Sequence, residues 1–122
     1  MLNVSLVALG GALGAAARYG VSLAFGRHAD AWPWATFAIN VSGSLLIGLL
    51  AGWLTTRGAA AEPWRLFLGV GVLGGFTTFS AFGLETFYLL RRGDYWIAGA
   101  YTVFSVVCGL AALILAYKSI AH

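Results

Sequence analysis

Four long blocks of apolar residues alternate with short polar segments along this chain. The blocks cover residues 4–25, 34–54, 66–90 and 95–117. Each is long enough to cross a bilayer, which takes about 20 residues in a helix. The connecting segments 26–33, 55–65 and 91–94 hold most of the charges and are expected to be loops. The pattern predicts an all-α membrane protein with four transmembrane helices in a single domain over residues 1–122.

The composition agrees with a membrane location. The chain is 61% hydrophobic and 9% charged, whereas a soluble domain carries about 25% charged residues. Its net charge of +3 comes from basic residues scattered singly between apolar blocks. That distribution is typical of anchors at membrane surfaces and does not indicate nucleic-acid binding.

The basic residues are divided almost evenly between the two sides of the predicted helices. Four spans place both termini on one side. That side would carry Arg57, Arg65 and Lys118, and the other Arg27, Arg91 and Arg92, joined by Arg18 if its side chain extends that way. An orientation is fixed only by a bias in Lys and Arg. The near balance predicts dual topology, in which copies insert both ways up, and hence an antiparallel homodimer.

Small residues recur at four-residue spacing in three of the blocks. They are Gly10 and Gly14, then Ser44, Gly48 and Gly52, then Gly71 and Gly75. Such spacing lets helix backbones approach closely. These contacts are expected either within one subunit or between two.

The third block contains a stretch that weakens a helix near its middle, residues 74–82 (GGFTTFSAF). Two adjacent glycines cost roughly 1 kcal/mol each relative to alanine, and paired threonines can bond back to the backbone. We therefore expect the third helix to be broken near mid-membrane. Non-helical backbone at that depth is tolerated only inside protein or beside a water-filled cavity, and such breaks often form ion sites. The stretch therefore indicates ion permeation.

Polar side chains within the spans have two interpretations each. Asn40 shares a helix face with Thr36 and Ser44, and its amide could bond a neighbouring helix or donate to an anion in a pore. Phe79 and Phe82 could be core residues, or their positive ring edges could replace the water around an anion.

The same choice applies to the remaining candidates. Glu85 is either a functional intramembrane acid or a residue that reaches the interface. Arg18 either holds anions at a vestibule or anchors the first helix. The hydroxyls of Tyr101 and Ser105 could donate to an anion or bond adjacent helices.

No set of residues in the sequence predicts an enzyme. Residues 69–74 fit GxGxxG, but a dinucleotide site would need a preceding strand and a βαβ unit. Cys108 is alone and forms no internal disulfide.

Three segments carry a resemblance to a known family. Residues 10–19 (GGALGAAARY), 36–44 (TFAINVSGS) and 74–82 occur in the same order as in the Fluc/CrcB family of fluoride channels, which are small four-span proteins of bacteria and archaea. The chain resembles that family over essentially its whole length, although Gly109 and Ala81 stand where relatives carry serine and threonine.

The resemblance implies a fluoride-selective channel for passive export across a prokaryotic inner membrane, giving fluoride resistance. It implies an antiparallel homodimer with two pores along the subunit interface. Asn40 would donate to fluoride, Phe79 and Phe82 would present ring edges, and the two kinds of residue in each pore would come from different chains. Hydroxyls in the pore would be those of Thr36, Ser80, Tyr101 and Ser105.

By the same likeness, Arg18 and Glu85 would lie at the vestibule and pore end. Backbone carbonyls of Gly74 and Thr77 from both subunits would hold a structural Na⁺ on the dimer axis. A small proton-coupled multidrug exporter is the alternative, but it would need an acid in the first span, where the charged residue is Arg18. An accessory subunit would not need Asn40 and the phenylalanines.

Overall fold

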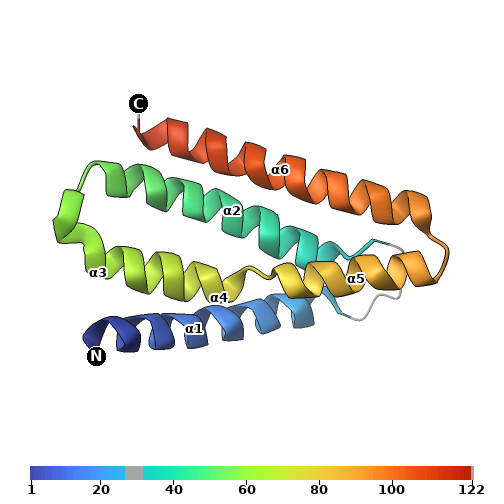
Figure 1. Cartoon of the computed structure of the whole chain (residues 1–122), viewed down its shortest axis with the longest axis horizontal. Helices are drawn as coiled ribbons and strands as arrows, with labels where there is room; N and C mark the ends of the chain where they lie inside the picture. Colours follow the sequence, from blue (N-terminus) through green and yellow to red (C-terminus); the bar gives the residue numbers. More distant parts are fainter. Residues whose placement is uncertain (27–31, 122) are drawn as a thin grey trace.

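A computed structural model describes residues 1–26 and 32–121. Within them the fold is all-α, and the chain passes four times along one long axis (Figure 1). The first, second and fourth passes are single helices, α1 (Leu2–Phe25), α2 (Trp34–Thr55) and α6 (Tyr95–Ala121). The third pass is composed of η1 (Gly58–Ala61), α3 (Glu62–Trp64), η2 (Arg65–Leu73), α4 (Gly74–Phe76) and α5 (Phe79–Arg91).

In this described part of the chain, four helical segments are long and apolar enough to cross a membrane. They are Leu2–Phe25, Trp34–Thr55, Gly58–Arg91 and Tyr95–Ala121. The predicted spans are confirmed to within a few residues at most ends, and the chain is a multi-pass membrane protein. Arg27 and most of the predicted loop 26–33 lie outside the described residues.

The prediction of a loop over residues 55–65 is wrong for most of its length. A short 3₁₀ turn, Gly58–Ala61, leads directly into α3 and η2. Pro63 lies in the first turn of α3, where its missing N–H costs no helical hydrogen bond. The Arg65 guanidinium donates to the Glu62 carboxylate one turn earlier. A proline in the first turn and the Glu62–Arg65 pair therefore favour a helix that starts earlier than hydrophobicity indicates.

The segment η2 is a π-helix rather than an α-helix. At its end, the Gly74 N–H donates to the carbonyl of Gly69, five residues earlier. Such wide turns are rare and occur often at functional sites. Nothing in the apolar pattern of the third block predicted it.

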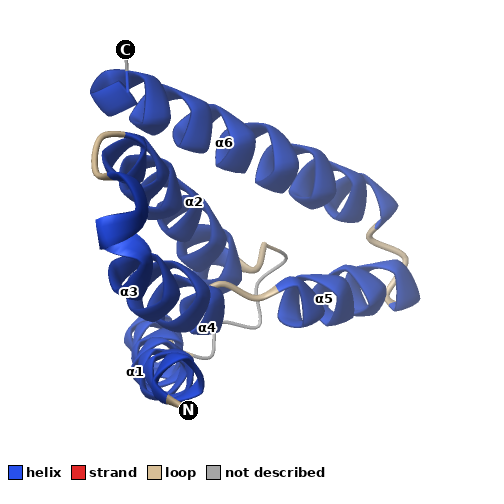
Figure 2. Cartoon of the chain, turned by 60° about the vertical axis from the view of Figure 1, so that its left-hand side comes forward, coloured by secondary structure: helices blue, strands red, loops and turns tan. Residues whose placement is uncertain are grey.

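Glycines hold α1 directly against η2 and α4, which lie beside it in both views (Figures 1 and 2). A Cβ atom on Gly10 would lie 2.5 Å from the Phe67 carbonyl oxygen, and one on Gly75 would lie 2.6 Å from that of Gly11. A Cβ atom on Gly14 would overlap the Val72 carbonyl. The predicted small-residue contacts of the first and third spans therefore lie within one chain.

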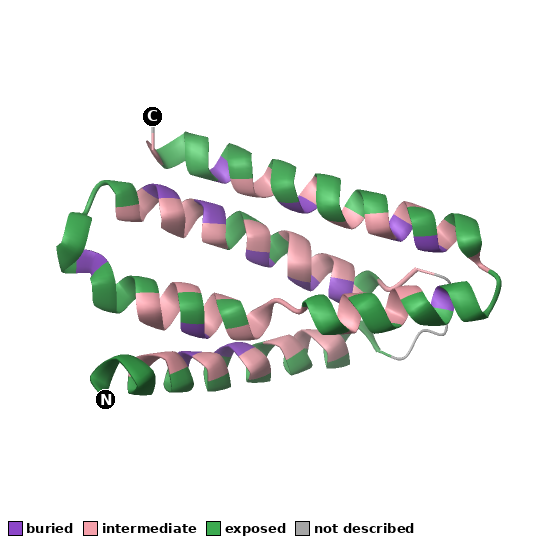
Figure 3. Ribbon diagram, in the orientation of Figure 1, coloured by how far each residue is buried: buried purple, intermediate pink, exposed green. Residues whose placement is uncertain are grey.

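The helices α2 and α6 form the other close pair. A Cβ atom on Gly48 would overlap the Leu113 carbonyl, and one on Gly52 would lie 3.0 Å from the Tyr117 carbonyl oxygen. These small-residue contacts are also within the chain. The two pairs leave most outward-facing residues exposed (Figure 3).

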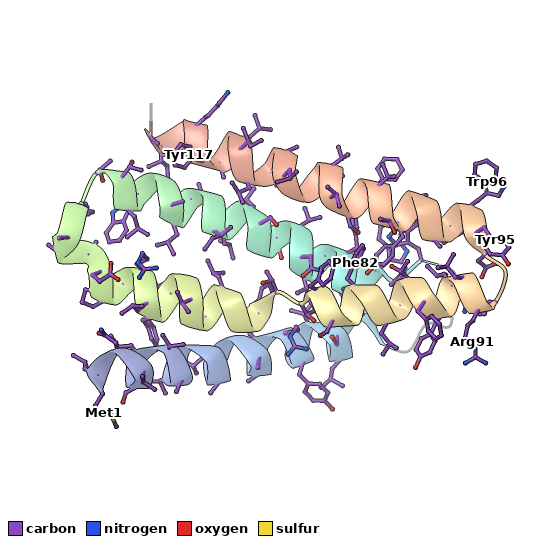
Figure 4. All side chains as sticks on the ribbon, in the orientation of Figure 1. Met1, Phe82, Arg91, Tyr95, Trp96 and Tyr117 are labelled. Carbon is purple, nitrogen blue, oxygen red and sulfur yellow. The ribbon has the colours of Figure 1, made fainter. Side chains whose placement is uncertain are left out.

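The exposed surface is apolar along the helices and carries charge and aromatic groups at their ends. Figure 4 shows Arg91, Tyr95 and Trp96 at the α5–α6 turn and Met1 and Tyr117 at the opposite end. Trp96 is 92% exposed and Tyr95 68% exposed. Aromatic residues in these places are typical of membrane–water interfaces.

Candidate functional site

Helical hydrogen bonding in the third pass stops at two threonines. Thr77 and Thr78 have extended backbones, with φ/ψ of −80°/156° and −150°/115°. The Thr77 N–H and hydroxyl both donate to the Leu73 carbonyl at 3.0 Å. The Thr78 hydroxyl accepts from the Ala81 N–H at 3.1 Å and so caps the start of α5. Thr77 thus lies at the end of α4, and Thr78 caps the start of α5.

Asn40 on α2 binds this interruption through both ends of its amide. Its Nδ2 donates to the Thr78 carbonyl at 3.0 Å, and its Oδ1 accepts from the Thr78 N–H at 2.8 Å. Because the backbone N–H needs an acceptor, the orientation of the amide is fixed. One hydrogen of Nδ2 is left over, since a primary amide has two. Asn40 therefore does bond a neighbouring segment, and it retains one donor.

The Asn40 contact changes the hydrogen bonding of Gly74. In a continuous α-helix the Thr78 N–H would donate to the Gly74 carbonyl, but here it is directed to Asn40. The Gly74 oxygen is thereby released from its usual α-helical donor. A free carbonyl is a hard neutral oxygen of the kind that binds alkali and alkaline-earth cations.

Arg18 reaches inward to the same interruption. Its Nε donates to the Gly75 carbonyl at 3.2 Å, and this carbonyl would bond to the Phe79 N–H in a continuous α-helix. Of the two interpretations left open for Arg18, this bond shows the side chain directed inward, because glycine packing brings α1 close enough for it to reach α4. A cation next to exposed helix C-terminal carbonyls is favourable.

A groove of about 400 Å³ lies beside the interruption. Among the predicted residues it brings together Asn40, Gly74, Thr77 and Phe79. Its further lining residues are Gly43, Ser44, Ile47, Gly69, Leu73 and Thr78. Of these, Thr78 and Ser44 were not predicted as site residues, although Ser44 shares the Asn40 helix face.

The two phenylalanines have different surroundings. Phe79 is 83% exposed, and its ring lies 5.7 Å from that of Phe82 at an angle of 44°. Phe82 points from α5 toward α2 and α6 (Figure 4), where its ring lies 5.1 Å from that of Tyr101. Phe82 is therefore partly a core residue, whereas Phe79 has most of its ring free.

A second polar group lies between α2, α5 and α6. The buried Tyr101 hydroxyl donates to Glu85 Oε1 at 3.3 Å, and Thr36 of α2 is also buried. The Glu85 side chain is thus held between α5 and α6. These three residues do not line the groove.

The last two predicted hydroxyls differ in exposure. Ser80 is exposed, with its Oγ 3.3 Å from the Thr78 hydroxyl oxygen. Ser105 Oγ is buried and has no hydrogen-bond partner among the described residues. A buried hydroxyl without a partner costs free energy, so Ser105 is a potential donor to a ligand.

A family model with the description "CrcB-like protein, Camphor Resistance (CrcB)" matches residues 5–117. Among curated relatives, the fluoride-specific ion channel FluC 2 of Nitrobacter hamburgensis is 48% identical, covering 99% of this chain and 98% of the relative. The fluoride-specific ion channel FluC of Hyphomonas neptunium is 54% identical over 90% and 88% of the two chains. That of Methylobacterium nodulans is 49% identical over 93% and 91%.

Proposed function

Since this chain belongs to the CrcB-like family, as its sequence motifs predicted, we propose that it is a fluoride-selective channel. It exports fluoride passively across a prokaryotic inner membrane and so confers fluoride resistance. The observation that carries the proposal is the near full-length similarity to proteins named as fluoride-specific channels. The family consists of channels, so the prediction that this chain is not an enzyme is confirmed.

We propose that two copies assemble as an antiparallel homodimer. The near balance of basic residues on the two sides supports insertion in both orientations. The exposed apolar side chains of α5, among them Phe79 and Leu84 at 83% and 51%, supply a surface that a second copy could cover. Two pores would then follow the interface, with Asn40 and the phenylalanines of each pore coming from different copies.

In each pore, neutral donors would replace the hydration shell of fluoride. The free Nδ2 hydrogen of Asn40, the ring edges of Phe79 and Phe82, and the hydroxyls of Thr36, Ser80 and Ser105 are the groups proposed for this. The Tyr101 hydroxyl would join them once its hydrogen leaves Glu85, to which it donates here. Donors of this strength suit conduction, because an ion must be able to leave each site. Arg18 and Glu85 would act at the ends of the path.

We further propose that a structural Na⁺ is held at the interruption, near mid-membrane on the dimer axis. The Gly74 and Thr77 carbonyls are the ligands, and the redirected Thr78 N–H supports this role for Gly74. In the described residues no group of three His, Cys, Asp or Glu side chains could hold a metal. Neutral backbone oxygens suit a hard monovalent cation.

The alternative, a proton-coupled multidrug exporter, has less support. Such a mechanism needs a membrane-embedded acid in the first span. All of α1 is described, and its sequence contains no Asp or Glu.

The deciding experiment measures anion release from liposomes that contain the purified full-length protein. Vesicles are loaded with potassium fluoride and potassium chloride at one pH, and valinomycin balances charge. We expect fluoride-selective electrodes to record rapid release while chloride is retained. Release no faster than from protein-free vesicles would contradict a channel, and release that needs a pH gradient would indicate proton-coupled transport in place of passive flow.

A further inference from the structure

The hydroxyl of Ser44 makes no hydrogen bond to any other residue in the described part of the chain. Its neighbours on α2 behave differently: Ser42 donates to the Ile39 carbonyl at 3.2 Å and Thr55 to the Gly52 carbonyl at 2.6 Å. Helical hydroxyls commonly bond back to the preceding turn in this way. The hydroxyl hydrogen of Ser44 therefore remains available to donate to a ligand.

Ser44 lies one helical turn from Asn40 on the same face of α2. Both residues line the groove of about 400 Å³ beside Thr77 and Thr78. Asn40 has one amide hydrogen left after bonding Thr78. Two unused donors thus follow one another along the wall of the groove.

The facing helix leaves room for the Ser44 hydroxyl. A Cβ atom on Gly109 of α6 would lie 3.3 Å from Ser44 Oγ, which is tighter than most real contacts. One turn earlier on α6, the buried Ser105 Oγ also has no partner among the described residues. The seam between α2 and α6 therefore contains two unbonded hydroxyls, one from each helix.

We infer that Ser44 is a further ligand of the permeating anion, donating its hydroxyl to fluoride one turn beyond Asn40. The inference rests on the proposed fluoride channel and adds a residue to its path. A hydroxyl donor suits a small dehydrated anion, because a short O–H donor can approach it closely. Gly109 contributes by leaving the space that the hydroxyl occupies.

The first test compares Ser44→Ala with Ser42→Ala. Both remove one hydroxyl from α2, and alanine favours a helix more than serine, so both variants should fold. In the liposome assay we expect Ser44→Ala to slow fluoride release by roughly tenfold, the effect of losing one hydrogen bond to an ion. Ser42→Ala, whose hydroxyl bonds its own backbone, should stay within about twofold of the wild type.

A second test moves the hydroxyl across the seam. The double variant Ser44→Ala with Gly109→Ser places a hydroxyl on α6 facing the vacated position, and Ser44→Ala with Gly109→Ala adds the volume without the donor. We expect the serine double variant to recover most of the lost fluoride flux and the alanine double variant to stay slow. Size-exclusion profiles and melting temperatures should match across the series.

The outcomes separate this inference from the proposed function. Wild-type flux in Ser44→Ala, equal slowing in Ser42→Ala, or equal rates in the two double variants would overturn the role of Ser44 while leaving the channel intact. A wild-type protein that releases no fluoride would overturn the channel itself.

Discussion

In the first half of the third pass, η2 and α4 meet α1 almost backbone to backbone, whereas in the second half α5 presents long side chains outward. A Cβ atom on Gly71 would lie 2.9 Å from Gly10 Cα, but one on Gly83 of α5 would meet nothing within 4 Å. Phe79 and Phe87 of α5 are 83% and 52% exposed. Figure 2 shows α5 turning away from α1 and α4.

This difference in packing indicates that the two halves of the third pass contact different partners. Close backbone contact leaves little freedom to adjust, so η2 and α4 are fixed to α1 within the chain. An exposed aromatic surface makes few contacts within the chain and is suited to lipid or a second copy. Under the proposed function, the first half anchors the ion site and the second half contributes the pore.

The two threonines join these halves, and side chains from two other helices hold the joint. Asn40 bonds Thr78 from α2, and Arg18 bonds Gly75 from α1. Both bonds occupy backbone groups that the interruption would otherwise leave unpaired within the membrane, which is costly. The interruption is thus stabilised by tertiary contacts.

The largest effect is expected from Gly75→Ala in the anchoring half. Its methyl group would lie 2.6 Å from the Gly11 carbonyl oxygen, and overpacking against backbone costs roughly 1–3 kcal/mol or more. We expect little monodisperse protein by size-exclusion chromatography and a lower melting temperature. Gly83→Ala, with open space around it, is the control and should be at least as stable as the wild type. Equal behaviour of the two variants would remove the contrast between the halves.

The joint is tested by Asn40→Asp. The carboxylate can still accept from Thr78 N–H but cannot donate to the Thr78 carbonyl, and its charge repels an anion. We expect fluoride release to fall by on the order of a hundredfold or more. Asn3→Asp adds the same charge at an exposed position on α1 and should have little effect. Unchanged flux in Asn40→Asp would exclude Asn40 from the path.

A smaller effect is expected from Phe79→Ile in the outward-facing half. The aliphatic side chain keeps an apolar surface but lacks the positive ring edge. We expect fluoride release to slow by at least about tenfold without loss of folded protein. Phe87→Ile changes another exposed ring of α5 and should remain near the wild-type rate. Equal slowing of fluoride release in both variants would mean that losing any exposed ring of α5 impairs the channel and that Phe79 has no specific role.

The helical passes could be predicted from sequence because membrane crossing is a local property. An apolar run of sufficient length forms a helix in lipid whatever its neighbours are, and hydrophobicity located all four passes. The third pass nevertheless begins earlier, at Gly58, where the sequence is not strongly apolar, and the apolar pattern gives no sign of the wide turns of η2.

The contacts around the interruption could be predicted only in part. Asn40 was identified because an amide in an apolar block needs a partner, but its partner Thr78 is 38 residues away. The bond from Arg18 to Gly75 spans 57 residues and depends on how closely α1 packs. The free Ser44 hydroxyl depends on the space above Gly109, which only the structure gives.

Both ends of the chain lie at the same end of the helices (Figure 1). A tandem gene joining two copies by a water-soluble linker would therefore insert both the same way up. Producing an inverted pair from one polypeptide would require a linker that itself crosses the membrane. An antiparallel arrangement predicts that only the fusion with the membrane-crossing linker gives an active channel, so comparing the two fusions tests how the copies face each other.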